Sequence, residues 1–207
     1  MNLFKKCIAE FIGAFGLVMA GCGAIAVNQI SDGAVTHVGI AISFGLIIAA
    51  MIYATGHISG AHLNPAVTLA FAATRHFPFR EVLPYITAQA LGAISASLVH
   101  KLTLTSVLQQ KFPNSVLNLG VAHPVDGVWM TAFVWEFILT FFLMFVVMAV
   151  ATDHRAVSKA APLAIGAVIG LEAMFAGPIC GASMNPARSF GPGLISGDWV
   201  HFSAYVF

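Results

Sequence analysis

The chain has 207 residues, of which 59% are hydrophobic and only 8% are charged. Soluble domains usually carry about 25% charged residues, so this composition predicts a protein whose solvent is lipid. The formal net charge of +1 gives no indication of nucleic-acid binding. The three cysteines form no CxxC pattern, so we expect neither a disulfide framework nor a metal site, and nothing else indicates a cofactor.

Five apolar stretches have about the 20 residues that a helix needs to cross a bilayer. They are Ile8–Val27, Val35–Thr55, Val82–Leu102, Trp129–Ala151 and Ala160–Phe175. The first is too long for a cleavable signal peptide and lacks a clear cleavage site, so we expect it to remain a span. A sixth stretch begins near Trp199 and reaches Phe207, about half a span. We therefore expect an all-α membrane protein whose native chain continues or which lacks one wall segment.

Two further segments, His57–Arg75 and Gly177–Leu194, are moderately apolar but rich in Gly, Pro, Asn and Ser. Each is too short and too broken to span the membrane. Irregular backbone at membrane depth is tolerated only where protein or a water-filled cavity covers it. Both segments are therefore predicted to be re-entrant loops.

The positions of Lys and Arg predict the orientation, because cytoplasmic loops carry an excess of both. If the spans alternate in direction, one side of the membrane receives Lys5, Lys6, Arg75, Arg80, Arg155 and Lys159. The other side receives only Lys101 and Lys111. We expect a cytoplasmic N-terminus and a place in the plasma (inner) membrane.

The chain contains an internal repeat within a single domain, residues 1–207. "AEFIGAF" and "ISGAHLNPAV" in the first half correspond to "WEFILTF" and "ICGASMNPAR" in the second. The first repeat covers 1–104, an external connecting loop 105–127, and an incomplete second repeat 128–207. Three spans per repeat would insert the two copies with opposite topology, and such repeats place a substrate path at their interface. Two halves that share a fold without a pore remain the alternative.

Each repeat contains an Asn-Pro-Ala tripeptide: Asn64, Pro65 and Ala66 in the first, and Asn185, Pro186 and Ala187 in the second. Asn is a strong N-cap residue and Pro fits the first helical turn. The tripeptides therefore predict short helices at Pro65–Thr74 and Pro186–Leu194, whose starts meet if the repeats are opposed.

Two helix starts that face each other have an electrostatic consequence. Each N-terminus carries roughly half an elementary positive charge, so their meeting point repels cations and protons. We expect the amide N–H groups of Asn64 and Asn185 to remain free, so that both donate to the oxygen of a passing water and interrupt a proton-conducting file.

The loops "GHISGAHLNPAVT" and "GASMNPARS" resemble the two signature loops of the aquaporin (major intrinsic protein) family. The similarity runs from end to end apart from the last span. It implies six tilted spans with two half-helices in the lipid bilayer and a homotetramer with one pore per subunit. It also implies passage of water and small neutral solutes. "FAGPICGASMNPAR" resembles the second loop of nodulin-26-like intrinsic proteins and their bacterial relatives.

Several charged residues lie inside the predicted membrane region, where charges are costly and usually functional. The resemblance implies that Glu10 and Glu136 accept hydrogen bonds from the loop backbones, although snorkelling to the interface remains open. It also implies that Arg188 forms the narrow outer constriction, where its fixed charge excludes cations; structural pairing with carbonyls is compatible with this role. The sequence leaves Glu172 undecided between a protonated group, an interface residue and a pore-mouth residue.

The resemblance places the rest of this selectivity filter at Phe44, Ala173 and Ala182, beside Arg188. Strict water channels of the family carry His where this chain has Ala173, so we expect water to pass together with glycerol-sized solutes or metalloid hydroxyls. Two features disagree with the passage of these larger solutes. Phe44 is typical of water channels, and Ser189 stands where glycerol facilitators usually have Asp.

Two other functions remain open: a secondary transporter, which would also have inverted repeats, and a structural membrane protein that does not conduct. An enzyme is not expected. His57 and His62 lie in a signature loop, but no nucleophile, acid pair or metal-ligand spacing accompanies them.

Overall fold

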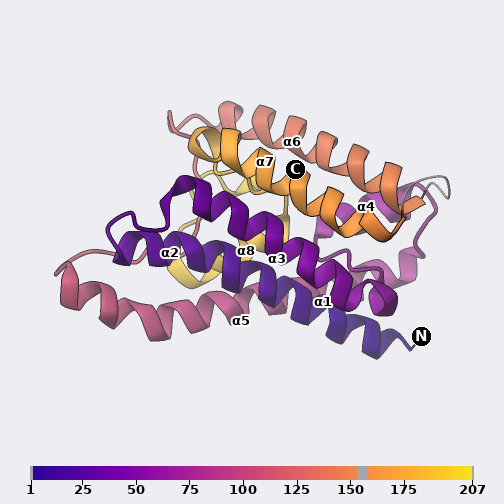
Figure 1. Ribbon diagram of the computed structural model, residues 1–207, viewed down its shortest axis with the longest axis horizontal. Coiled ribbons are helices and arrows are strands. Elements are labelled where there is room, and N and C mark those ends of the chain that lie inside the picture. Colours follow the sequence, from indigo (N-terminus) through magenta and orange to yellow (C-terminus); the bar gives the residue numbers. More distant parts are fainter. Residues whose placement is uncertain (1, 153–157, 207) are drawn as a thin grey trace.

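The computed structural model describes residues 2–152 and 158–206, and all regular structure in them is helical (Figure 1). Eight α-helices account for most of it: α1 (Leu3–Leu17), α2 (Gly23–Ile30), α3 (Thr36–Ser59), α4 (Pro65–Ala73), α5 (Phe79–Lys111), α6 (Trp129–Thr152), α7 (Ala161–Cys180) and α8 (Pro186–Ser196). A π-helix, η1 (Val18–Cys22), joins α1 to α2, and two short 3-10 helices are η2 (Ser158–Ala160) and η3 (Phe202–Tyr205).

Five helical segments are long and apolar enough to cross a membrane: Leu3–Ile30, α3, α5, α6 and α7. The five predicted spans are therefore confirmed, but several extend further than hydropathy indicates. The largest difference is in α5, which passes Leu102 and continues to Lys111 into the predicted connecting loop. Buried Leu108 packs there with Leu117 and Leu119, so this polar extension is stabilised by tertiary contacts that hydropathy does not detect.

The helix α7 also runs further than predicted, to Cys180, so the second irregular loop begins at Gly181 and not at Gly177. Pro178 lies inside the helix and cannot donate a backbone hydrogen bond to Met174. His37 Nε2 lies 2.6 Å from the Met174 carbonyl oxygen and donates in its place. A side chain from α3 thus explains why this proline does not end the helix.

The segment predicted to start a sixth span near Trp199 contains a turn followed by the four-residue η3. Tyr205 in η3 donates a hydrogen bond of 2.6 Å to the carbonyl of Cys180 at the end of α7. This contact attaches the segment to the loop before α8.

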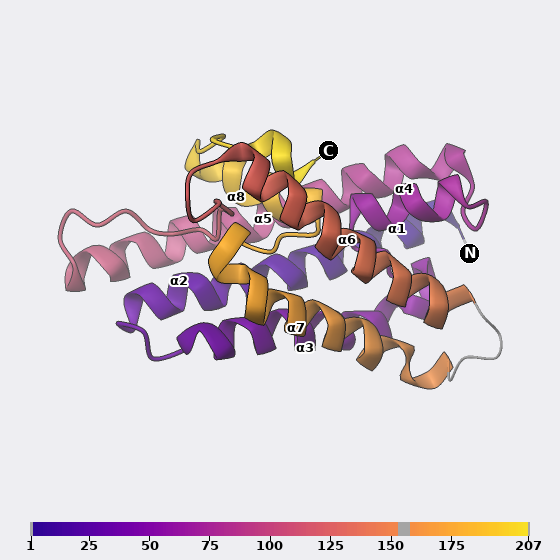
Figure 2. The same ribbon diagram turned by 90° about the horizontal axis from the view of Figure 1, so that it is seen from above.

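The long helices lie side by side, and the two half-helices α4 and α8 follow the second span of each half (Figure 2). The main packing pairs are α3 with α7, α1 with α5, α1 with α3, α6 with α7 and α5 with α8. The pair α3 and α7 joins the two halves of the chain. This arrangement brings α4 and α8 toward the same interior region.

Two glycines allow α3 and α7 to approach closely. A Cβ atom on Gly45 would lie 2.6 Å from the carbonyl oxygen of Gly166, and one on Gly166 would collide with the carbonyl oxygen of Gly45. Small residues at such crossings let helix backbones pack tightly in membranes.

Gly45→Ala is expected to destabilise the protein by roughly 1–3 kcal/mol, the usual cost of overpacking. The measurement is thermal unfolding of the purified protein in detergent. Gly56→Ala is the matched control in the same helix, because its Cβ would meet only Ile52 Cγ2, at 3.7 Å. Equal melting temperatures for both variants would contradict the proposed role of this crossing.

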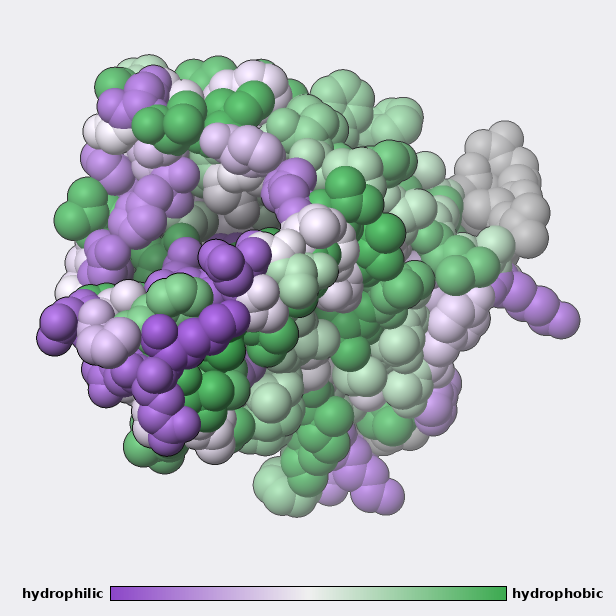
Figure 3. Space-filling view, turned by 60° about the vertical axis from the view of Figure 1, so that its left-hand side comes forward, coloured by the Kyte–Doolittle hydropathy of each residue, from purple (hydrophilic) through white to green (hydrophobic). Residues whose placement is uncertain are grey.

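Large apolar side chains cover the outer sides of the helices. In Figure 3, hydrophobic residues cover much of the visible face, while hydrophilic ones gather toward one end. The exposed large hydrophobic residues of the helices include Leu46, Leu83, Leu102, Phe137, Phe145 and Leu171. Such an apolar exterior fits a lipid environment and not water.

Candidate pore

Two irregular loops, residues 60–64 and 181–185, lead into the half-helices α4 and α8. Both loops begin with a glycine at φ 88°, Gly60 or Gly181, which ends the preceding helix. Both then place non-glycine residues at positive φ: Ala61 (48°) and Leu63 (53°) in the first loop, and Ala182 (40°) and Met184 (52°) in the second. Such residues cost of order 1–3 kcal/mol each and persist only where the surroundings enforce them. The loops are therefore two copies of one constrained structure.

Each half-helix is capped by the asparagine of its tripeptide. Asn64 Oδ1 accepts a hydrogen bond of 2.8 Å from the Ala66 N–H, and Asn185 Oδ1 accepts one of 3.0 Å from Ala187. Pro65 and Pro186 occupy the first helical turn, where a missing N–H has no cost.

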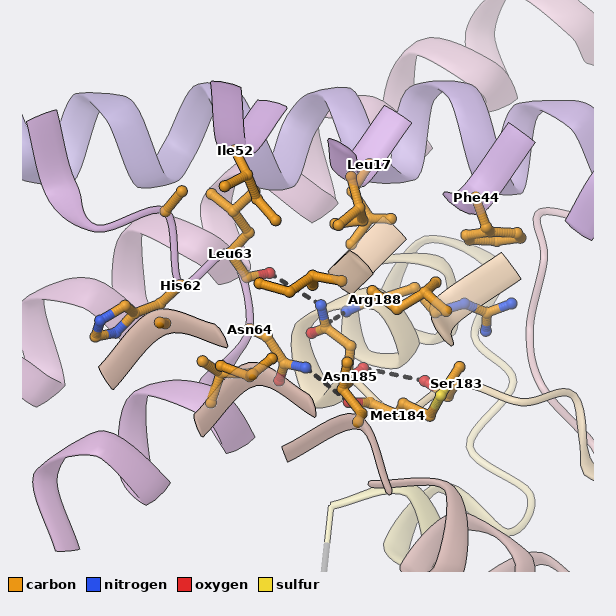
Figure 4. A pocket seen from close by; sticks show the side chains of 18 of the residues that line it. Leu17, Phe44, Ile52, His62, Leu63, Asn64, Ser183, Met184, Asn185 and Arg188 are labelled. Carbon is orange, nitrogen blue, oxygen red and sulfur yellow. Dashed lines mark hydrogen bonds between the residues drawn. The ribbon is translucent and has the colours of Figure 1, made fainter. Parts of the chain in front are cut away.

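The two asparagines also bind the opposite loop (Figure 4). Asn64 Nδ2 donates to the Met184 carbonyl at 2.7 Å, and Asn185 Nδ2 donates to the Leu63 carbonyl at 2.9 Å. We expected the side-chain amide of each asparagine to be free to donate. This expectation is wrong for one N–H of each amide, which is bonded to the opposite loop. An amide has two N–H donors, so one remains on each asparagine. The bonded donors hold the two helix starts against each other.

Glu10 anchors the first loop and is fully buried. One oxygen accepts from the Ser59 hydroxyl at 2.6 Å and the His62 N–H at 2.9 Å. The other accepts from the Leu63 N–H at 2.6 Å and from Gln89 Nε2 at 2.8 Å. Four donors therefore fix this carboxylate, which does not snorkel to the interface.

Glu136 has the same relation to the second loop. It is 5% exposed and accepts from the Ser183 N–H at 2.8 Å and the Met184 N–H at 2.6 Å. Glu172 is buried in α7, and one of its oxygens has no hydrogen-bond partner in the part of the chain that the structure describes. Its neighbour Ala173 lines the cavity described next, whereas Glu172 is not among the lining residues.

A cavity is lined by residues of both loops, including both asparagines. It brings together the four residues proposed from the sequence as a filter, namely Phe44, Ala173, Ala182 and Arg188. Apolar side chains form most of its remaining wall: Leu17, Ile48, Ile52, Val67, Leu143, Val147, Ile165 and Ile169.

Arg188 is the main charged group of this cavity wall. It is 3% exposed, and its guanidinium carbon lies 5.2 Å from the centroid of the Phe44 ring, within cation–π range. Nε and Nη1 have no acceptor among the described residues. Buried donors normally have an acceptor, so these two are an exception among the described residues.

Sequence reasoning missed several polar residues that support the loops. Gln89 Nε2 bridges Glu10 and the Thr68 hydroxyl, at 2.8 and 3.0 Å. The Ser183 hydroxyl donates to the Asn185 carbonyl at 3.0 Å. The sequence did contain a signal for Gln89, because a polar amide side chain is unusual within an apolar span. His57 lies exposed on α3, whereas the His62 ring nitrogen Nδ1 bonds the Thr68 hydroxyl at 3.2 Å.

The structure has the features of a membrane channel. It has five spanning helices and two half-helices whose N-termini meet, and the asparagines at both N-termini line the cavity. The model of the Major intrinsic protein family matches residues 1–207, and the chain belongs to this family. It is thus an integral, multi-pass membrane channel for water and small solutes. Because family members are channels, the transporter alternative is set aside, and the expectation that the chain is not an enzyme is confirmed.

Individual relatives agree. Aquaporin NIP1-1 of Oryza sativa subsp. japonica is 48% identical, over 98% of this chain and 68% of that protein. Nodulin-26 of Glycine max is 45% identical, over 98% of this chain and 73% of the relative. The aquaglyceroporin from Plasmodium falciparum has a similar structure, with a TM-score of 0.82 and 26% identity, covering 99% of this chain and 90% of that one. The resemblance to nodulin-26-like proteins is confirmed.

Proposed function

We propose that this channel conducts water together with glycerol-sized polyols or metalloid hydroxyls, and that it excludes protons and ions. The observation that carries the proposal is the buried guanidinium of Arg188, with two donors lacking a protein acceptor, beside the ring of Phe44. The two side chains offer different contacts to a solute. Arg188 supplies donors for hydroxyl oxygens, and Phe44 supplies an apolar ring for carbon-bound hydrogens.

The other two filter positions favour solutes larger than water. Ala173 and Ala182 each carry only a methyl group, so neither adds a bulky or polar wall. A hydrated solute must exchange its water shell for contacts in the channel, and a wider filter lowers the steric cost of that exchange. The structural relative named as an aquaglyceroporin supports a polyol as the larger solute.

Exclusion of protons and cations is proposed from the meeting half-helices. Their N-termini each contribute roughly half a positive charge, and Arg188 adds a full one. This is the explanation generally given for aquaporin-type pores. The remaining N–H of each asparagine, Asn64 and Asn185, would orient a passing water and interrupt a chain of proton transfers.

We further propose a homotetramer in the plasma membrane with a cytoplasmic N-terminus. The Lys6 ammonium pairs with Glu81 at 2.8 Å, so the N-terminus and the start of α5 lie at one end of the bundle. Lys101 and Lys111 donate to the carbonyls of Ile195 and Ile30. These lysines belong to the predicted external side, and Arg155 of the predicted cytoplasmic side lies outside the described residues.

The test is osmotic shrinkage of proteoliposomes, followed by light scattering, first with sucrose and then with glycerol as the osmolyte. We expect rapid shrinkage with sucrose, and with glycerol rapid shrinkage followed by re-swelling. Shrinkage without re-swelling would contradict the polyol part of the proposal. Rates equal to those of empty liposomes would contradict conduction itself.

Ala173→His is expected to reduce glycerol flux by roughly tenfold or more while water flux changes less, because steric discrimination in a tight site has this magnitude. The imidazole adds bulk at a cavity-lining position that carries only a methyl group in this chain. Stopped-flow measurements of both permeabilities check the prediction. Ala160→His, at the exposed N-cap position that precedes α7, is the matched control and leaves the ratio unchanged.

A further inference from the structure

The first span contains a π-helical turn at the level of the proposed filter. η1 (Val18–Cys22) interrupts an otherwise continuous α-helix from Leu3 to Ile30. Single π-helical turns within α-helices are rare and are frequent at functional sites. None of the four filter residues lies in η1, so its position requires a separate explanation.

Gly21, inside this turn, faces the ring of Phe44. The three heavy atoms nearest to a Cβ built on Gly21 all belong to that ring, and even the third, Cζ, would lie only 2.7 Å away. Real Cβ atoms almost never come so close to another atom. The ring of Phe44 therefore occupies the space that a side chain at position 21 would need.

The turn is also held on other sides. His100, 2% exposed on α5, donates from Nε2 to the Met19 carbonyl at 3.1 Å. A Cβ on Gly23 would lie 2.9 Å from the same Nε2, so the ring lies directly against the backbone. Buried Cys22 packs under Gly120, where an added Cβ would approach its Sγ to 2.9 Å. These contacts prevent η1 from moving away when the space toward Phe44 is filled.

We infer that Gly21 is a specificity-determining residue that sets how deeply the Phe44 ring sits in the channel wall. The inference rests on the proposed function, because it concerns the width of the same filter. Phe44 lies against Gly21 of η1 and also lines the cavity. Its ring lies near the Arg188 guanidinium (Figure 4). A methyl group at position 21 must displace the ring toward Arg188 and narrow the opening.

The test compares water and glycerol permeability of proteoliposomes that contain wild-type protein, Gly21→Ala or the double variant Gly21→Ala/Phe44→Ala. We expect Gly21→Ala to lower the glycerol-to-water ratio by roughly tenfold, the effect of small changes of bulk in a tight pocket. The double variant should recover glycerol flux, since the displaced ring is gone. Gly16→Ala is the control in the same span, because its Cβ would meet the flexible end of Met51, at 3.0 Å from Sδ.

An unchanged ratio in folded Gly21→Ala overturns the inference. Gly21→Ala could fail to fold. In that case a double variant that folds supports the contact between Gly21 and Phe44, and a double variant that also fails to fold overturns the inference. Wild-type protein that passes water but no glycerol contradicts the proposed solute range alone. The inference is then read from water flux, which Gly21→Ala must lower and the double variant must restore.

Discussion

Arg188→Val is expected to give a folded channel that leaks protons. Arg188 Nε and Nη1 make no hydrogen bond to the described residues, and the loop backbones are bonded by Glu10 and Glu136 instead. Removal of Arg188 eliminates a fixed positive charge from the cavity wall. A unit charge about 4 Å away contributes roughly 4 kcal/mol at an effective dielectric constant near 20, so proton flux should rise roughly a hundredfold or more.

The measurement is acidification inside proteoliposomes that contain a pH-sensitive dye, with a potassium diffusion potential as the driving force. Arg188→Lys is the matched control, since it keeps the charge and loses the planar donor array. We expect Arg188→Lys to remain proton-tight and to change solute flux. Equal proton flux in wild-type protein and Arg188→Val would show that the half-helix tips alone exclude protons.

Glu136→Ala is expected to abolish the channel by releasing its second loop. The Ser183 and Met184 N–H groups would lose their acceptor, and each unsatisfied buried donor costs roughly 1–3 kcal/mol. This loss is a large fraction of the stability of an ordinary protein. Little monodisperse protein should be recovered, with water flux near that of empty liposomes.

Glu136→Gln is the matched control for this prediction. The amide keeps one acceptor oxygen at the same reach, so we expect partial recovery of folded protein and of water flux. Size-exclusion profiles and stopped-flow rates distinguish the two variants. Wild-type behaviour of Glu136→Ala would mean that the strained loop backbone is held by other contacts.

The spans and half-helices could be predicted from sequence because their signals are local. Long apolar runs and the Asn-Pro pair each specify a structure without reference to distant residues. The extension of α5 depends on Leu108 packing, and the continuation of α7 past Pro178 depends on His37 from another helix. Both are tertiary effects that local patterns do not contain.

The sequence predicted which residues form the candidate site but not the hydrogen bonds between them. The internal repeat and the family resemblance indicated Asn64, Asn185 and Arg188. The exchange of hydrogen bonds between the asparagines and the opposite loops required the three-dimensional arrangement, because Asn64 and Met184 are far apart in sequence. The π-helical turn behind Phe44 has no recognised local signal in "VMAGC".

The central claim is that the two loops enter one aqueous path from opposite faces of the membrane. Single cysteines at Ala61 and Ala182, both cavity-lining positions, test it in a background from which the half-buried Cys7 is removed. Water flux is measured after a membrane-impermeant thiol reagent is applied from one side. We predict block of Ala182→Cys from outside only and of Ala61→Cys from inside only; block of both from the same side would contradict the account.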